Sequence, residues 1–210
     1  MNQTLAGTPE RCAWAIGSAR YVAYHDHEWG VPVHEDSTLF EFIILESAQA
    51  GLAWSTILNK RQGYRTAFAH FNPADVARFS AQEVTRLMHN PAIVRHRGKI
   101  DAAIGNAQAV LQIQQEFGSL DHYLWQFVDG QPIQNHWQTP AEVPTRTAQS
   151  DALSKALKQR GFSFFGTTIC YAFMQAVGMV NDHTAQCYRH ASCASESQQQ
   201  TIKKNKNNKY

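Results

Sequence analysis

The stretch SDALSKALKQRGFSFFGTTICYAFMQAVG, residues 150–178, decides the fold class of this chain. Its apolar residues recur at helical spacing on either side of a short segment bounded by Gly161 and Gly166. We expect Ser150 to cap a first helix that ends at Gly161, and Thr167–Val177 to form a second helix closed by the next glycine. The stretch therefore predicts two helices joined by a tight turn.

The start of the second helix allows two interpretations. Exposed backbone N–H groups at a helix N-terminus favour an anion such as phosphate, and Gly166, Thr167 and Thr168 stand at that start. The other interpretation is a helical hairpin with a purely structural role. On the residues of this segment alone, the structural role is favoured.

Helical signals continue outward from this hairpin, whereas strand signals are scarce. An almost entirely apolar segment from Leu39 to about Gln49 predicts a buried central helix capped by Ser37. Ser80 and Glu83 have the spacing of a capping box ahead of another apolar helical pattern. The fold class we expect is all-α.

The chain shows no internal repeat and no Gly/Ser-rich linker. Residues 134–147, which include Pro140 and Pro144, are predicted to form one long irregular loop. We expect a single folded unit over residues 11–193, with disordered ends at 1–10 and 194–210, the latter rich in Gln, Asn and Lys.

Composition and charge limit the classes of protein. The chain has 210 residues, and its hydrophobic share of 43% is ample for a sizeable core. The net charge is +2, but the segment 194–210 alone carries +3, so the rest of the chain carries −1. Because phosphate neutralisation by Lys and Arg dominates non-specific nucleic-acid affinity, composition does not reveal a DNA-binding protein. Any binding to DNA must come from local geometry.

The sequence also indicates where the protein is located in the cell. No apolar run approaches the ~20 residues of a membrane helix, and the first residues lack a signal-peptide pattern. Four cysteines are too few for a disulfide scaffold in a chain of this length. We expect a cytoplasmic protein with no membrane partner, whose cysteines bind a metal or lie in the core.

Two groups of metal-binding side chains stand near the ends of the chain. They are Cys12, His25 and His27 at the start, and His183, Cys187, His190 and Cys193 at the end. His183 and Cys187 are four residues apart, so on a helix they would share one face. Two thiolates with two imidazoles form the closed tetrahedral shell of a structural zinc site. Ordinary buried cysteines with solvated histidines remain the alternative on spacing alone.

Two acidic residues interrupt the apolar segment. Burying an unpaired carboxylate costs several kcal/mol, so each must face solvent or find a partner. Glu41 is the better candidate for solvent exposure. Glu46, if it is buried, would receive hydrogen-bond donors or a cationic ligand, and the alternative is an exposed position for it too.

The N-terminal third is rich in aromatic rings: Trp14, Tyr21, Tyr24, Trp29 and Trp54. Any one such ring is by default a core residue. Near a carboxylate, however, Trp and Tyr are also what a pocket for a flat, electron-poor ring requires, through stacking and cation–π attraction.

Taken together, these residues resemble the DNA-3-methyladenine glycosylase I family, within the helix-hairpin-helix glycosylase superfamily. The matching stretches are RCAW at 11–14, YHDHEWGVP at 24–32, LESAQAGLAW at 45–54, RHRGKI at 95–100, SDALSKALKQRGF at 150–162 and FGTTICYAFMQAVGMVNDH at 165–183. The resemblance extends, in order, over about residues 11–188, and its long motifs make it specific.

The resemblance implies a helix-hairpin-helix fold, with the hairpin near residues 150–178, and a structural zinc ion. The implied ligands are Cys12, His25, His183 and Cys187. The ion would join the N- and C-terminal segments.

The resemblance also implies the roles of the pocket residues. Glu46 corresponds to the base-recognising carboxylate, with Tyr24 and Trp54 around the base and Trp14 and Tyr21 lining the site. Glu46, Tyr24 and Trp54 are therefore the expected catalytic residues.

For DNA binding, the resemblance implies two segments. The turn Gln49-Ala50-Gly51-Leu52 matches the element that enters the DNA stack, and Gly161, Gly166, Thr167 and Thr168 belong to the phosphate-binding hairpin. Ser47 stands where relatives carry Gly. Related glycosylases place a catalytic Asp after the hairpin, and Asp182 is the one nearby candidate here, although this family is thought to lack that group.

The activity implied is that of a monofunctional DNA-3-methyladenine glycosylase. Adenine methylated at N3 is cationic in DNA, so its glycosidic bond is weakened and the leaving base is neutral. The enzyme flips the nucleotide out of double-stranded alkylated DNA, binds the ring and hydrolyses the bond. It leaves an abasic site, releases 3-methyladenine and does not cleave the strand, and we expect it to act as a monomer.

Two other classes stay open. A non-catalytic nucleic-acid-binding module would keep the hairpin and the zinc but would not need Glu46. A zinc hydrolase would need an open metal position, which four protein ligands deny.

Overall fold

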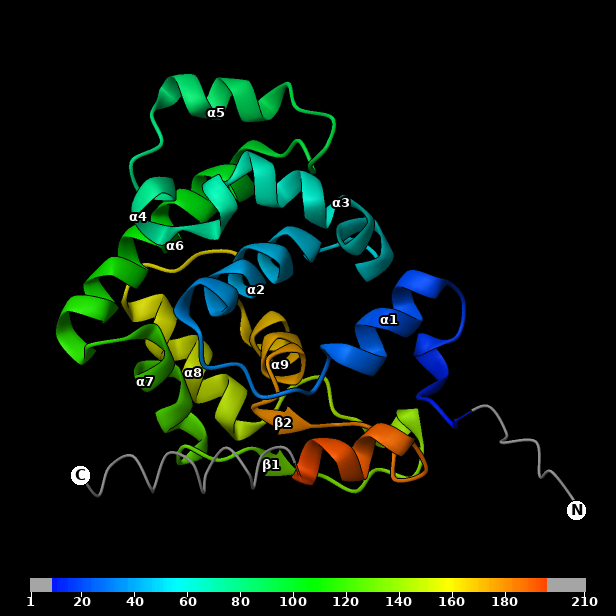
Figure 1. Cartoon of the computed structure of the whole chain (residues 1–210). Coiled ribbons are helices and arrows are strands. Elements are labelled where there is room, and N and C mark those ends of the chain that lie inside the picture. The colour runs from blue at the N-terminus through cyan, green and yellow to red at the C-terminus, as the bar shows by residue number, and fades with distance from the viewer. Residues whose placement is uncertain (1–8, 196–210) are drawn as a thin grey trace, which may run out of the picture.

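The computed structural model describes residues 9–195, and helices dominate it (Figure 1). The α-helices are α1 (Ala19–His27), α2 (Asp36–Gln49), α3 (Trp54–Ala67), α4 (Pro73–Val76), α5 (Ala81–Met88), α6 (Arg97–Phe117), α7 (Leu120–Trp125), α8 (Ala148–Gln159) and α9 (Thr167–Ala176). Single 3-10 turns are η1 (Ala13–Ala15), η2 (Ala69–Phe71), η3 (Gln126–Val128) and η4 (Pro140–Glu142). The prediction of a helical fold is confirmed.

The described residues also contain two very short strands, which the all-α expectation did not include. β1 (Ile133–Gln134) and β2 (Val180–Asn181) pair in parallel, with Ile133 opposite Val180. This pairing attaches the start of the loop 134–147 to the segment that follows α9.

Helix α2 is the centre of the molecule, as its apolar sequence predicts. Every residue from 39 to 48 is buried, because this helix packs against α3, α6, α7 and α9 on different sides. A helix that is apolar on nearly all faces can only be stable where neighbours surround it. These neighbours fix the position of α2, and its C-terminal end, with Glu46 and Gln49, reaches a pocket.

The start of α2 differs from the prediction. Glu35, not Ser37, is the N-cap residue: its carboxylate accepts a hydrogen bond from the Thr38 backbone N–H at 2.7 Å. Ser37 lies inside the first turn and donates its hydroxyl to the same carboxylate at 2.5 Å. A charged acceptor at the N-terminus is favoured over a hydroxyl by the helix dipole.

The exposed position predicted for Glu41 is wrong. Its side chain is buried, and its two oxygens accept hydrogen bonds from Arg61 Nε and Arg65 Nη2, each at 2.7 Å. Both arginines lie on α3, which packs directly on α2. The sequence could not show this partnership, because it depends on how two helices are placed side by side.

The predicted hairpin exists as α8, a turn and α9. Gly161 adopts φ +91° just after α8, as a helix-ending glycine does, and Gly178 adopts φ +70° after α9. The cap of α8 differs from the prediction: Thr147 is the N-cap, and Ser150 completes a capping box with it. The capping box predicted for Ser80 and Glu83 is confirmed at α5.

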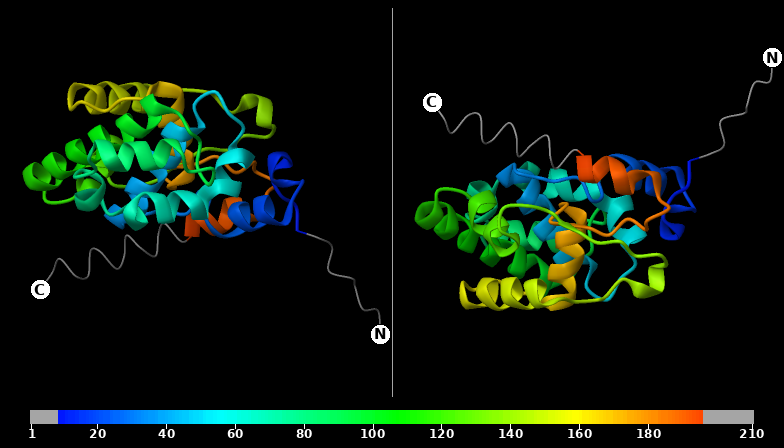
Figure 2. Two further views of the ribbon diagram at one scale, coloured as in Figure 1. Left: turned by 90° about the horizontal axis from the view of Figure 1, so that it is seen from above. Right: turned by 90° about the horizontal axis from the view of Figure 1, so that it is seen from below.

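The two ends of the described chain meet. Figures 1 and 2 show the first turns and the last helix side by side at one end of the molecule, and the Tyr188 backbone N–H donates to the Glu10 carbonyl at 3.0 Å. That last helix begins at Tyr188 and continues to residue 195. Residues 194 and 195 are thus helical, contrary to the prediction of disorder, and the predicted disordered ends 1–8 and 196–210 lie outside the described residues.

Within residues 9–195, no helix combines the length and the apolar character needed to cross a membrane.

Candidate active site and metal centre

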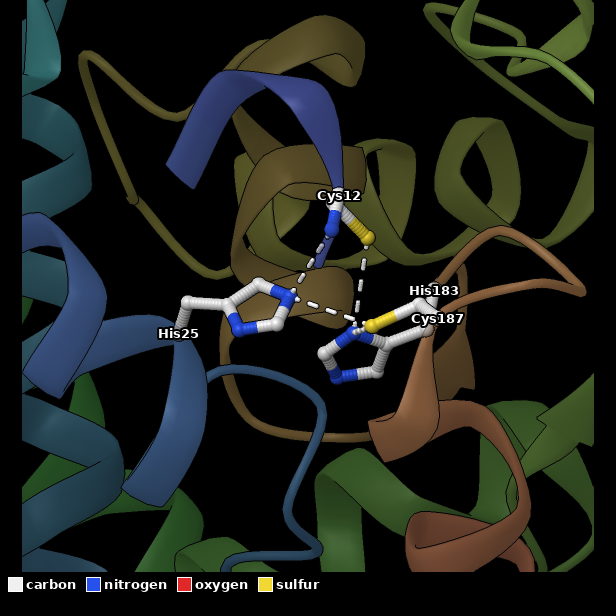
Figure 3. A group of neighbouring side chains, drawn as sticks. All are labelled: Cys12, His25, His183 and Cys187. Carbon is white, nitrogen blue, oxygen red and sulfur yellow. Dashed lines mark hydrogen bonds between the residues drawn. The ribbon is translucent and has the colours of Figure 1, made fainter. Parts of the chain in front are cut away.

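The four predicted metal ligands come together from both ends of the chain (Figure 3). Cys12 precedes η1, His25 lies on α1, and His183 and Cys187 follow β2. One ligand atom from each residue lies within 4.8 Å of all the others, and all four side chains are buried. Cys187 Sγ lies 3.4 Å from His25 Nε2 and 3.5 Å from His183 Nδ1, and Cys12 Sγ lies 3.6 Å from His183 Nδ1.

Three other sequence candidates do not belong to this cluster. His27 is exposed, and His190 Nε2 donates to the Asn135 carbonyl at 2.7 Å. Cys193 is buried but accepts a hydrogen bond from Arg189 at 3.4 Å. Spacing alone did not separate these residues from the true members, because the choice depends on how the chain ends meet.

The rings of the two histidines are held from behind. His25 Nδ1–H donates to Asp26 Oδ1 at 2.8 Å, and His183 Nε2–H donates to the Trp29 carbonyl at 3.1 Å. The other nitrogen of each ring, His25 Nε2 and His183 Nδ1, faces the cluster. Such outer partners are what metal-binding histidines require.

Charge and packing support the same arrangement. The Arg11 guanidinium, aided by His25, holds the pKa of Asp26 well below its usual range, so this carboxylate stays ionised behind the His25 ring. At Gly30, with φ +78°, an added Cβ would lie 2.9 Å from His183 Nε2. Only glycine allows the backbone to approach the ring so closely. The donor set of two sulfurs and two imidazole nitrogens fits a tetrahedral zinc ion.

Beside this cluster lies a pocket of about 520 Å³. All five predicted pocket residues line it: Trp14, Tyr21, Tyr24, Glu46 and Trp54. Tyr24 comes from α1, Glu46 from the last turns of α2, and Trp54 from the first residue of α3. The pocket thus lies where α1, α2 and α3 meet, beside α9, and sequence order alone could not establish that meeting.

Glu46 is buried, which agrees with its interpretation as a receptor for a donor or a cation and not with an exposed position. Within the described part of the chain, no group donates a hydrogen bond to its Oε2 atom. Burial raises the pKa of Glu46 to about 8, since removing a carboxylate from water disfavours its charged form. A buried acid without a partner, facing a pocket, is a receptor for a donor or a cation that the protein itself does not supply.

The rings around Glu46 form the sides of the pocket. The Tyr24 and Trp54 ring centroids are 5.4 Å apart with the planes inclined at 46°, and Trp14 packs edge-on against Tyr21 at 5.9 Å. Trp54 Nε1 is buried and, among the described residues, also has no hydrogen-bond partner. Trp14 is 37% exposed, which places it at the rim rather than in the core.

The turn that follows Glu46 is exposed to solvent. Gly51 adopts φ +77°, a conformation that favours glycine, and the Leu52 side chain is 40% exposed. Gln49 lines the pocket beside Glu46. An apolar side chain held at the tip of a turn beside a pocket is placed to contact a large ligand.

The hairpin reaches the same pocket. Thr168, in the first turn of α9, lines it, and the α9 N-cap Gly166 provides no side-chain cap for the helix. The Thr167 hydroxyl donates to Asp151 on α8. At Gly166 an added Cβ would meet no atom within 4 Å, and no side chain caps the first backbone N–H groups of α9.

One wall of the pocket was not predicted from the sequence. The loop 134–147 contributes Pro140, Val143, Pro144 and Thr145 to the lining. Their only sequence signal is the pair of prolines, which indicates a rigid loop but not its position.

Asp182 also lines the pocket, but its oxygens are occupied. They accept hydrogen bonds from Asn135 Nδ2 (2.7 Å), Trp137 Nε1 (2.7 Å), Tyr171 Oη (2.6 Å) and Gln175 Nε2 (2.8 Å). The buried carboxylate therefore connects the loop after β1 to α9. These four hydrogen bonds explain why a buried carboxylate stands beside His183, and they require no chemical role for it.

The comparisons with known proteins agree with this geometry. The family model for methyladenine glycosylases matches residues 14–190. The chain is 53% identical to DNA-3-methyladenine glycosylase 1 of Escherichia coli (strain K12) over 178 residues, which is 85% of this chain and 95% of that protein.

Two solved structures show the same fold. A crystal structure of 3-methyladenine DNA glycosylase I is 51% identical and superposes with a TM-score of 0.83, over 85% of this chain and 98% of the other. A Tyr-to-Phe variant of 3-methyladenine DNA glycosylase I in complex with 3-methyladenine is 39% identical, with a TM-score of 0.83, over 85% and 96% of the two chains. The chain belongs to the methyladenine glycosylase family.

Proposed function

We propose that this chain excises 3-methyladenine from alkylated double-stranded DNA by hydrolysing the N-glycosidic bond, leaving an abasic site and an intact strand. The support is membership of the family, a relative named as a DNA-3-methyladenine glycosylase and a similar structure in complex with 3-methyladenine. The observation that carries the proposal is Glu46, a buried acid in an aromatic pocket, whose Oε2 atom accepts no hydrogen bond from any residue of 9–195.

In the proposed mechanism Glu46 recognises the base. The adenine N6 amino group would donate to the carboxylate, and the positive charge of the methylated ring would stabilise the ionised form. Tyr24 and Trp54 would hold the ring by stacking and cation–π attraction. Since the cationic base is already a good leaving group, binding the flipped nucleotide leaves little chemistry for a general acid to supply.

Flipping requires the protein to fill the space that the base leaves. The turn Gln49–Leu52 follows directly after the helix that carries Glu46, and it presents exposed Leu52 beside the pocket. We propose that Gln49, Gly51 and Leu52 enter the DNA stack and fill the space that the flipped base leaves. The cost of unstacking is a few kcal/mol and is lower for a damaged base.

The hairpin is proposed to hold the DNA backbone. Gly161 follows the C-cap of α8, and Gly166, Thr167 and Thr168 begin α9, whose first backbone N–H groups have no side-chain cap. A helix N-terminus attracts phosphate through these groups and through the helix dipole. Local geometry would in this way supply the affinity that the net charge of the chain does not.

A zinc ion held by Cys12, His25, His183 and Cys187 would have a structural role in this proposal. Four protein ligands leave no open position for substrate, and the ion would join the two ends of the folded unit, residues 11–193. Because His25 directly follows Tyr24, the ion would also hold one side of the pocket. The protein is proposed to act as a monomer in the cytoplasm.

A non-catalytic DNA-binding module is the alternative function. It would gain nothing from a buried acid whose pKa is raised to about 8, since such a group destabilises the folded chain. The test is release of free base from methylated duplex DNA, separated by chromatography. Release of 3-methyladenine with an abasic product supports the glycosylase; binding of the DNA without release establishes the module.

A further inference from the structure

The motif RHRGKI, residues 95–100, matches the family but has received no role in the mechanism. It forms the start of α6, a long helix that packs against α2 (Figure 1). Two side chains of α6, Lys99 and Asn106, stand at positions i and i+7 and therefore share one face of the helix. Each of them bonds to one of the two segments proposed to bind DNA, the turn after α2 and the hairpin turn.

Lys99 holds the turn after α2. Its ammonium Nζ donates to the Ala48 carbonyl at 2.7 Å and to the Ala50 carbonyl at 2.6 Å. The last carbonyls of a helix have no partner within the helix, and a cation at this end is favoured by the dipole. The ammonium is partly desolvated there, which lowers the pKa of Lys99. Lys99 thus fixes the start of the turn that leads from Glu46 to Trp54.

Asn106 holds the hairpin turn. Its side chain is fully buried, its Nδ2 donates to the Ser163 carbonyl at 3.1 Å, and its Oδ1 accepts from the Ser163 backbone N–H at 2.9 Å. The next residue, Phe164, adopts φ +54° and is 41% exposed. An added Cβ at Gly98 in α6 would lie 3.3 Å from its ring. The first half of α6 therefore fixes the tip of the hairpin.

We propose that Lys99 and Asn106 act together as a brace that sets the distance between the turn Gln49–Leu52 and the hairpin turn Ser163–Phe165. They are positioning residues for base excision and do not contact the base. The inference rests on the proposed function of these two segments. An enzyme that holds a phosphate with one segment and enters the DNA stack with another needs both at a fixed separation, since a misplacement of 1 Å can cost about 100-fold in rate.

The experiment compares Lys99→Met, Asn106→Ala and the double variant, with Gln108→Ala as the control. Gln108 lies on the same helix and donates to the Ala77 carbonyl at 3.2 Å, away from both segments. Each brace variant is expected to lower kcat/KM for 3-methyladenine in duplex DNA about 10- to 100-fold. The affinity for free 3-methyladenine should change less than about twofold, and the control should match the wild type.

The double variant distinguishes a brace from two separate supports. Either substitution breaks the same link, so the activity of the double variant should equal that of the less active single variant. Three results would overturn the proposal. The first is a loss of kcat/KM in the double variant equal to the product of the two single losses. The others are a fall in free-base affinity as large as the fall in kcat/KM, and single variants whose activity on duplex DNA stays within twofold of the wild type. Because buried Asn106 is sensitive to substitution, Lys99→Gln provides a second comparison. Its amide NH₂ is neutral and has two N–H donors against three in Lys, so its activity should lie between those of Lys99→Met and the wild type. Equal activity in all three proteins overturns the brace.

A structural measurement separates this inference from the proposed function. The Leu52 backbone N–H donates to the Gln49 carbonyl, and Lys99→Met should speed its hydrogen exchange while the same amide in Gln108→Ala stays unchanged. Absence of base release by the wild type would refute the proposed function alone. Unchanged exchange at Leu52 in Lys99→Met would refute the brace alone.

Discussion

Two carboxylates of one helix, Glu41 and Glu46, show the difference between holding a fold and serving a site. Both lie on α2 and both are 3% exposed. Glu41 accepts from Arg61 and Arg65, whereas Glu46 faces a pocket with its Oε2 unpartnered within the described chain. Equal burial therefore says nothing about role. What separates the two residues is whether the protein itself supplies the partner.

The largest effect is expected at the Cys/His cluster, because Tyr24, which lines the pocket with Glu46, directly precedes the proposed metal ligand His25. Cys187→Ala should release the metal and unfold much of the protein, since structural zinc couples ~10–16 kcal/mol of binding to folding. Metal content and thermal unfolding measure this. Freshly purified wild-type protein without stoichiometric zinc would contradict the structural assignment.

The next largest effect is predicted for Glu41. Glu41→Gln removes the charge between Arg61 and Arg65. Arg65 is 39% exposed and Arg61 keeps its ion pair with Glu28, so the loss should be about 2–3 kcal/mol, below the ~3–5 kcal/mol of a fully buried pair. Denaturant unfolding should show this loss. The affinity of the remaining folded protein for free 3-methyladenine should stay within about twofold of the wild type. A large loss of base affinity without a loss of stability would reverse the roles assigned to the two acids.

Glu46→Gln should have the opposite profile. Loss of a charge-assisted hydrogen bond costs ~1.5–3 kcal/mol, so free-base affinity should fall roughly 10- to 100-fold while some excision of 3-methyladenine remains. Calorimetry and single-turnover kinetics measure the two quantities. Intact base affinity with turnover reduced by several orders of magnitude would make Glu46 a chemical catalyst, since a general acid or base contributes ~100- to 10,000-fold.

The same variant tests the raised pKa of Glu46. The folded protein binds this proton more tightly than the unfolded chain, so wild-type stability should fall as pH rises from about 4.5 to about 8. Relative to Glu46→Gln, the fall by pH 7 should be on the order of 3 kcal/mol. The kcat/KM for excision should rise with pH until the carboxylate ionises near 8, and it should be flat in this range for the Gln variant. Identical pH profiles for the two proteins would show that Glu46 does not titrate in this range.

The smallest effect is expected at the hairpin. Gly166→Asp adds a side chain where nothing lies within 4 Å, and Asp is a favourable N-cap residue, so the fold should tolerate it. The added negative charge should weaken duplex binding about tenfold at any DNA sequence, because it opposes the phosphate there. Binding of free 3-methyladenine should not change. An equal fall in both affinities would mean that the hairpin supports the pocket and does not hold DNA.

Local chemistry determined much of this protein. The helical spacing and the glycines of residues 150–178 were enough to predict two helices and their turn, since capping and glycine conformations act within a few residues. The apolar sequence around Phe42 likewise required α2 to be central. The long motifs shared with the methyladenine glycosylases identified the four metal-cluster residues and the five pocket residues that the structure brings together.

Tertiary structure decided what depends on distant neighbours. The exposed position predicted for Glu41 was wrong because its partners lie on α3, and the cap predicted at Ser37 was wrong because Glu35 offers a stronger acceptor. The loop 134–147 became a pocket wall through the pairing of β1 with β2 and through the hydrogen bonds of Asn135 and Trp137 to Asp182. Lys99 and Asn106 likewise found their partners on other elements. A sequence records the capacity of a residue to bond, whereas the fold alone brings a second residue within the ~3 Å at which a hydrogen bond forms.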